Sequence, residues 1–275
     1  MSIATVESLW RYPITGGPGI SVGDIEVIAG GFIDDRTLIL AEETDEGLRR
    51  IGTKQAPQLL QMRYNNDGSA VQLGTHEIEL PAWQLDAEET PDTTCYEFGD
   101  YTPVLFVGEE YDDAFSSYLD RRVRLVRKSS RWQLGDHIAP RERANASLHV
   151  IGAESVEAIA DASGSTLAPD PRRAKPNIVT RGLEAHAELG MIGQSLWISS
   201  VVASCWIQID RGTARCPVPS LDPETGENLG DMSLRAMPKS PNREGKEVAS
   251  AGVYAHMINA HGHIAVGDAI SIKEL

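Results

Sequence analysis

The residue best suited to chemistry in this chain is Cys216, which lies in the stretch "GTARCPVPSLDPETG" at residues 212–226. Arg215 adjoins it, and two prolines follow closely and favour an extended, non-helical backbone. A cationic neighbourhood favours the thiolate, the form of cysteine that attacks electrophiles or binds soft metal ions. The pattern therefore indicates a functional thiol at Cys216, acting as a nucleophile or as a metal ligand.

The other two cysteines lack such neighbours. Cys205 lies in the apolar stretch "SSVVASCWIQI" and is expected to be a buried small hydrophobe, and Cys95 in "TTCYEFGD" has no basic residue beside it. Three cysteines this far apart indicate neither a disulfide framework nor a Cys-x-x-Cys zinc site. We therefore expect reduced thiols and a cytoplasmic protein.

A second cluster of potential ligands consists of His256, His261 and His263 in "AHMINAHGH". Two imidazoles on one strand face could bind zinc or iron. No carboxylate or cysteine completes the set at a recognised spacing, and a surface turn explains the cluster equally well. The chain has no Gly-x-Ser-x-Gly nucleophile elbow and no phosphate-binding Gly-x-x-x-x-Gly-Lys-Ser/Thr loop.

The net charge of the chain indicates which classes of partner it can bind. Forty acidic and 25 basic residues give a formal net charge of −15, which repels a nucleic acid backbone and an anionic bilayer. The apolar runs are shorter than a membrane span, and no basic segment followed by an apolar run stands at the start. We expect no nucleic acid partner, no membrane partner and no targeting segment.

Short strands are expected to carry these residues. Segments rich in β-branched residues and bounded by Gly, Pro, Asn or Asp predict strands within residues 24–31, 36–42, 59–65, 70–74, 76–81, 103–108, 123–128, 147–152, 177–182, 205–210 and 263–272. Helical spacing of apolar residues occurs at 109–119 and 153–162. The predicted fold class is mostly β (α+β), with barrels or sandwiches and a few short helices.

Turns and loops complete this outline. Residues 163–175 are rich in Pro and Arg and predict an exposed loop, and residues 235–250 predict a polar excursion. The segments "ISVGDIEV" (20–27) and "IAVGDAISI" (264–272) share a pattern that predicts a strand, a Gly-Asp bend and a second strand.

Taken in order, several motifs resemble the MOSC family in the form that carries an N-terminal β-barrel domain. They are "LWRYPI", "GGFIDDR", "GTKQAPQL", "DDAFSSYLDRRVRLV", "LHVIGAESV", "KPNIV", "ARCPVPSLDPETG", "GVYA" and "GHIAVGDAISI". The resemblance implies an N-terminal MOSC-type β-barrel domain over residues 1–127 and a MOSC β-barrel domain over residues 128–275.

The resemblance also implies a site. In the family, the cysteine after the arginine supplies a thiolate to molybdenum, so Cys216 is the implied metal ligand and catalytic residue, and the molybdenum cofactor (Mo-molybdopterin) is the implied cofactor. The family also carries an association with pyridoxal phosphate. The implied cofactor-binding residues are Arg36, Lys54, Ser155, Lys175, Asn177, Arg215 and Tyr254.

Four positions depart from the family pattern. Thr15 and Gly16 stand where relatives usually have lysine and serine, and Lys54 and Lys175 stand where arginine is usual. Lysine keeps the positive charge but lacks the planar fork that binds a phosphate through two hydrogen bonds.

The activity implied by the resemblance is reduction of small N-hydroxylated substrates. A separate electron-transfer protein must supply the electrons, because the chain shows no flavin, haem or iron–sulfur motif. Two alternatives remain open. One is a sulfur-transfer protein that carries a persulfide on Cys216, and the other is a non-catalytic MOSC binding module.

Overall fold

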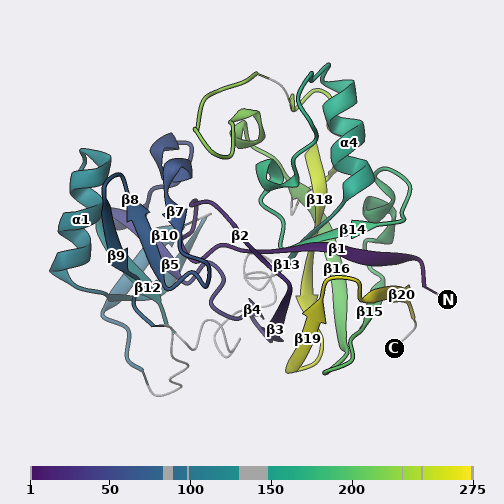
Figure 1. The fold of residues 1–275 in the computed structure, drawn as a ribbon, viewed down its shortest axis with the longest axis horizontal. Helices are drawn as coiled ribbons and strands as arrows, with labels where there is room; N and C mark the ends of the chain where they lie inside the picture. The colour runs from purple at the N-terminus through teal and green to yellow at the C-terminus, as the bar shows by residue number, and fades with distance from the viewer. Residues whose placement is uncertain are drawn as a thin grey trace.

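The structure is a computed structural model that describes residues 2–82, 89–97, 99–129, 148–230, 232–242 and 244–273. Strands dominate these residues, and they form two main bodies, seen on the left and right of Figure 1. The prediction of a mostly β fold with barrels and a few short helices is confirmed.

The larger body is a nine-stranded sheet. Its strands are β1 (Ala4–Arg11), β2 (Ile20–Val22), β13 (Leu148–Gly152), β14 (Ile178–Arg181), β15 (Ser195–Ser199), β16 (Cys205–Ala214), β17 (Lys239–Pro241), β18 (Glu247–Met257) and β20 (Ala269–Ile272). The path runs β13-β14-β1-β20-β15-β16-β18-β17, and β13 also pairs with β18. This last pairing closes the strands from β13 round to β18 into a ring.

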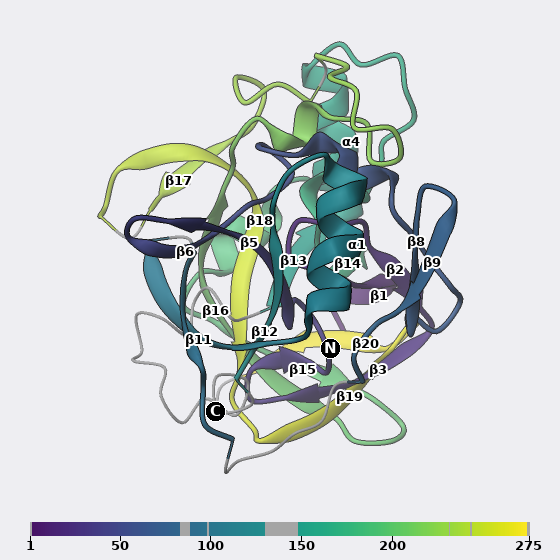
Figure 2. The same ribbon diagram turned by 90° about the vertical axis from the view of Figure 1, so that its left-hand side faces the viewer.

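The smaller body contains a closed barrel in the order β10-β11-β12-β5-β6. Its strands are β5 (Leu38–Thr44), β6 (Gly47–Arg50), β10 (Thr93–Glu97), β11 (Asp100–Phe106) and β12 (Arg124–Lys128). Beside it lies a sheet of β7 (Arg63–Tyr64), β8 (Ala70–Leu73) and β9 (His76–Glu79). Figure 2 shows this body from its own side, with α1 (Glu109–Leu119) in front.

The two ends of the chain meet in the larger body. In Figure 1 the purple β1 lies among the green and yellow strands that follow residue 148. A further sheet joins β3 (Asp24–Ile28) and β4 (Gly31–Phe32) to β19 (His261–Ala265). The strand-bend-strand prediction for 20–27 and 264–272 is confirmed, and the two copies pair directly through β3 and β19. The division at residues 127 and 128 stays a prediction.

Both predicted helices are confirmed, as α1 and as α4 (Ala153–Ala162). Their apolar spacing explains their packing. Phe115 and Leu119 of α1 belong to the core cluster that includes Leu125 of β12. Val156 and Ile159 of α4 belong to the cluster under β13, β14 and β18. Short 3-10 turns make up η1 (Pro57–Gln61), η2 (Pro171–Ala174), η3 (Ala187–Met191) and η4 (Val218–Ser220).

Two expectations were wrong in part. Of the predicted strand at 59–65, only Arg63–Tyr64 is a strand, β7; the segment begins inside η1, because Pro57 starts a turn that buries both Leu59 and Leu60. The predicted polar excursion at 235–250 contains a hairpin, in which β17 pairs with the start of β18. Among the described residues, no helix has the length and apolar character needed to cross a membrane.

Candidate functional site

Cys216 lies just beyond the end of β16, between Ala214 and η4, and its side chain is exposed. Cys95 and Cys205 are fully buried, as predicted. Burial raises the pKa of each of these two thiols to about 12. Cys216 is therefore the one cysteine of this chain that solvent and solutes reach in the folded protein.

The guanidinium of Arg36 is fixed from several sides. Its Nη1 donates to Asp35 and to Asn177 Oδ1, the latter at 2.9 Å, and its Nη2 donates to the carbonyl oxygen of Lys175 at 3.0 Å. The guanidinium also stacks on the ring of Tyr12, 4.6 Å from the ring centre. Arg36 lies on a turn and has φ 54°, in the left-handed region, and its contacts with Lys175 and Asn177 reach residues of the larger body. The result is a rigid cation at the junction of the two bodies.

Asn177 is the residue that links this cation to the large sheet. Its side chain is fully buried, and Oδ1 accepts from Arg36 and from the backbone N–H of His149 at 3.1 Å. Its Nδ2 donates to the carbonyl of Trp10 at 3.2 Å. Both Oδ1 and Nδ2 of the Asn177 side chain are hydrogen-bonded to protein atoms. Asn177 therefore serves to position Arg36.

Lys175 ties two turns of the smaller body to the larger one. Its Nζ donates to Gly16 O at 2.6 Å, to Gly17 O at 2.9 Å and to Thr53 Oγ1 at 3.0 Å. These three acceptors match the three N–H groups of an ammonium. Burial, together with the neighbouring arginines, among them Arg36, lowers the pKa of Lys175 to about 7.

Two further arginines lie within electrostatic reach of Cys216. Burial lowers the pKa of Arg215, and the neighbouring Tyr254 and Cys216 oppose that shift. Burial also lowers the pKa of Arg50, and the nearby Glu97 carboxylate opposes that shift. Within the described chain, the Nε of Arg215 is buried and has no hydrogen-bond partner. A cluster of partly buried cations beside an exposed thiol is an environment suited to an anion.

His149 is a residue of the site wall that sequence reasoning missed. The side chain is almost fully buried, with Nε2 2.9 Å from Ala251 O and Nδ1 3.3 Å from Lys175 O. Burial, and then the charge of Arg215, lowers the pKa of His149 to about 3. The imidazole is therefore neutral at physiological pH. A histidine in an apolar strand segment such as "LHVIG" carries no local signal of such a position.

The remaining predicted site residues are placed differently. Ser155 is fully buried at the start of α4, where its hydroxyl donates to Glu188 Oε2 at 2.8 Å and accepts from the His186 N–H. Lys54 is exposed on the turn after β6. Tyr254 lies on β18, with its ring 5.9 Å from that of His149. The structure thus brings Arg36, Lys175, Asn177, Arg215 and Cys216 together, with Tyr254 at the margin.

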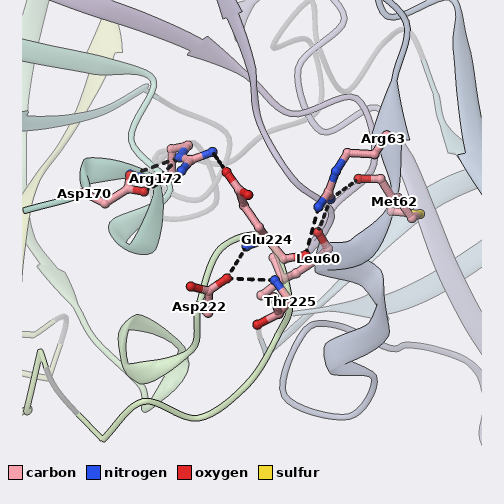
Figure 3. Close-up of polar contacts among 8 residues, drawn as sticks. All are labelled: Leu60, Met62, Arg63, Asp170, Arg172, Asp222, Glu224 and Thr225. Carbon is pink, nitrogen blue, oxygen red and sulfur yellow. Dashed lines mark hydrogen bonds and ion pairs between the residues drawn. The ribbon is translucent and has the colours of Figure 1, made fainter. Parts of the chain in front are cut away.

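The loop after Cys216 is attached to both bodies, as Figure 3 shows. Asp222 Oδ1 accepts from the N–H groups of Glu224 and Thr225, each at 2.8 Å, which closes a tight turn. The Glu224 carboxylate pairs with Arg172 at 3.1 Å, and the Glu224 carbonyl accepts from Arg63 at 3.1 Å. The loop that follows the thiol is thereby held against the smaller body.

The loop also depends on a glycine. Gly226 has φ +75° and packs against Pro57, where a Cβ would lie 2.6 Å from the proline carbonyl oxygen. Only glycine combines this backbone conformation with so close an approach.

The histidine cluster shows no shared site. His256 pairs with Asp210 at 3.0 Å, and His263 pairs with Asp24 at 3.2 Å. His261 lies 3.9 Å from Glu26. Over the described ranges, no group of three or more His, Cys, Asp or Glu side chains could hold a metal ion.

Two family models match this chain, one after the other along the sequence. The family model described as the MOSC N-terminal beta barrel domain matches residues 3–122, and the MOSC domain model matches residues 130–271. Mitochondrial amidoxime reducing component 2 of Bos taurus is 25% identical over 290 residues, which covers 98% of this chain and 83% of that protein. The crystal structure of the YUAD protein from Bacillus subtilis superposes with a TM-score of 0.42 at 11% identity, over 97% of this chain and 93% of that one. The chain belongs to the MOSC domain family, and it is related to the amidoxime reducing component.

Proposed function

We propose that this protein binds the molybdenum cofactor through Cys216 and reduces small N-hydroxylated compounds, with electrons from a separate electron-transfer protein. The observation that carries the proposal is the exposed Cys216 thiol beside a cluster of partly buried cations. Membership of the MOSC family and the name of the bovine relative, an amidoxime reducing component, support the cofactor and the reaction class.

The residues of the site fit this group. A thiolate is a soft ligand suited to molybdenum, and Cys216 is accessible. The described residues offer no cluster of three protein ligands, which suits a metal whose other ligands come with an organic cofactor. The buried Nε of Arg215 has no partner among those residues, and it would gain one from an anionic group.

Each side chain then has a role. Cys216 would hold the metal, and Arg36 and Arg215 would attract the anionic part of the cofactor. Asn177 positions Arg36, and Lys175 holds the turn at Gly16. When bound, the cofactor supplies the two-electron redox chemistry that no side chain of this chain can supply.

The reaction has a defined balance. Cleavage of the N–O bond of an N-hydroxyamidine consumes two electrons and two protons, and it yields the amidine and one water molecule. The electrons come from the partner protein and the protons from solvent.

The proposal is tested by reduction of an N-hydroxyamidine with a chemical electron donor, using protein made in a host that synthesises the cofactor. We expect turnover by the unsubstituted protein and its loss in Cys216→Ser, which replaces a soft ligand by a hard one. A Cys216→Ser variant that keeps its molybdenum and its turnover would contradict the assignment.

A second candidate function is favoured by the same exposed thiol. A persulfide on Cys216 is anionic, so the neighbouring cations would stabilise it without any metal. Intact-protein mass spectrometry distinguishes the two functions. A protein without molybdenum that carries one extra sulfur atom on Cys216 would support sulfur transfer.

A further inference from the structure

A serine, a histidine and an aspartate lie in a row in the larger body. The hydroxyl oxygen of Ser200 is 3.4 Å from Nδ1 of His263, and Nε2 of the same imidazole is 3.2 Å from Oδ1 of Asp24. In such a row the imidazole can take a proton from the hydroxyl, while the carboxylate stabilises the positive charge that forms on the ring. No Gly-x-Ser-x-Gly motif surrounds Ser200, but catalytic rows of this kind are defined by their geometry and recur without that motif.

The backbone holds the three residues together. Ser200 begins the turn at residues 200–204, which joins β15 to β16. The N–H of His263, on β19, donates to the Ala203 carbonyl at 2.8 Å and so attaches β19 to this turn. Asp24 lies on β3, which pairs with β19, one diagonal step from His263 on the same face of the sheet. The row is therefore built on two paired strands and a turn bonded to them.

The row lies far from Cys216. The turn that carries Ser200 precedes the first residue of β16, whereas Cys216 follows the last residue of that strand. A strand of ten residues is about 30 Å long. In Figure 1, β3 and β19 lie near the lower edge of the larger body. The two sites share no residue.

The surroundings of Ser200 indicate a class of substrate. Val201 is 98% exposed and Val202 is 68% exposed, so two apolar side chains next to the hydroxyl are open to solvent. They offer an apolar surface that the acyl chain of a substrate could cover. Asp24 is 67% exposed, and the chain has a net charge of −15, so an anionic acyl donor is disfavoured.

We propose that Ser200, His263 and Asp24 form a catalytic site that hydrolyses neutral esters of short apolar acids. Ser200 Oγ bonds to the ester carbonyl carbon and its proton passes to His263 Nδ1; the ester C–O bond then breaks, and the alcohol leaves with that proton. Water attacks the acyl-serine, and His263 takes a proton from the water. The acid is released as that proton returns to Ser200 Oγ, and Asp24 stabilises the imidazolium in both steps.

A short-chain alkyl fluorophosphonate is the direct probe, because an activated serine attacks its phosphorus and displaces fluoride as it would attack an ester. Peptide mass spectrometry locates the modified residue, so the unsubstituted full-length protein can be used, with or without a cofactor. We expect modification of Ser200 and none of Ser199, the exposed serine beside it. Absence of modification at Ser200 would overturn the proposal.

Substitutions at the other two residues test their roles. His263→Gln should slow modification of Ser200 about 100-fold, the lower end of what a general base contributes. Asp24→Asn should slow it about twofold to fivefold, because so exposed an ion pair is weak. His261→Gln is the matched control, since His261 lies on the same strand and is 70% exposed, and it should leave the rate unchanged. Thermal unfolding shows whether each variant is folded. A folded His263→Gln that is modified at the unsubstituted rate would overturn the proposal.

The class of ester is tested with p-nitrophenyl acetate and p-nitrophenyl butyrate. The assay uses the Cys216→Ala variant, because the exposed thiol would also attack these esters. We expect hydrolysis of the butyrate to be faster by about threefold, as partial burial of two methylene groups requires. Val201→Asn in the same background should bring the ratio of the two rates close to one. A ratio that is unchanged by Val201→Asn would overturn the assignment of an apolar acyl chain.

Discussion

Replacing Lys175 by methionine tests the tie between the two bodies. Methionine keeps much of the length and apolar volume of the side chain and removes the three hydrogen bonds from Nζ. Gly16 O keeps its bond from the Thr53 hydroxyl, at 2.6 Å, whereas the Gly17 carbonyl loses the bond from Lys175. The substitution also removes a charge whose pKa is lowered by burial and by neighbouring arginines.

The magnitude follows from these opposing effects. A buried acceptor left without a partner costs about 1–3 kcal/mol, and relief of the charge repulsion offsets part of that cost. We therefore expect Lys175→Met to lower the free energy of unfolding by about 1–2 kcal/mol near pH 8, which corresponds to a fall of about 2–8 °C in Tm for a chain of this size.

The pH dependence gives a sharper signature. The pKa of Lys175 is lowered to about 7 in the folded protein, from 10.5 in the unfolded chain. Between these values the unfolded chain binds more protons, so this residue makes stability rise with pH, by up to about 1.4 kcal/mol per pH unit. Lys175→Met loses this contribution, and its deficit relative to the unsubstituted protein should widen from pH 7 to pH 9.

Thermal unfolding of both proteins at pH 6, 7, 8 and 9 measures this difference. Lys246→Met is the matched control, because Lys246 is exposed in the hairpin between β17 and β18. Parallel curves for Lys175→Met and the unsubstituted protein over pH 7–9 would refute the reasoning about the pKa. An unchanged Tm at every pH would refute the structural role.

Three further predictions test other parts of the structure. Cys205→Ser places a hydroxyl in an apolar core and should lower the free energy of unfolding by about 1–3 kcal/mol, measured by thermal unfolding. Cys216→Ser at an exposed site should change that free energy by less than about 0.5 kcal/mol. Equal changes in the two variants would contradict the burial of Cys205 and the exposure of Cys216. Gly226→Ala forces a Cβ toward the Pro57 carbonyl at a positive φ, so limited proteolysis should cleave the 222–226 loop faster in this variant. The control is Gly230→Ala, which also has a positive φ but has no atom near the added Cβ. Equal cleavage rates in the two variants would show that the loop is not held at Gly226. Lys128→Met removes the ammonium that pairs with the buried Glu97 carboxylate, which keeps its bond from the Thr102 hydroxyl, and should cost about 3–5 kcal/mol by urea unfolding. A cost below about 1 kcal/mol would contradict the buried pair.

Local patterns in the sequence predicted the elements whose core positions follow a regular period. The helices at 109–119 and 153–162 are examples, since both bury one face at helical spacing. By contrast, β1 was not predicted. Its buried residues Ala4, Val6 and Leu9 break strict alternation, because the register with β14 shifts between Val6 and Ser8. A bulge of this kind depends on the partner strand and leaves no local signal.

Some residues of the candidate site could be predicted from local sequence, and others could not. The stretch around Cys216 pointed to a functional thiol, because the arginine and the prolines adjoin it in sequence. The engagement of Lys175 could not be predicted, since its acceptors Gly16 and Gly17 lie far away in the chain.

Molybdenum content shows most directly whether Cys216 holds the proposed cofactor. Full-length protein and its Cys216→Ala variant are made in a host that synthesises the cofactor, purified in parallel and analysed for metal, with Cys205→Ala as the control for loss of a thiol elsewhere. We expect close to one molybdenum per chain in the unsubstituted protein and in Cys205→Ala, and loss of most of the metal in Cys216→Ala. An unsubstituted protein without molybdenum, or a Cys216→Ala variant that retains it fully, would show that Cys216 does not hold the metal.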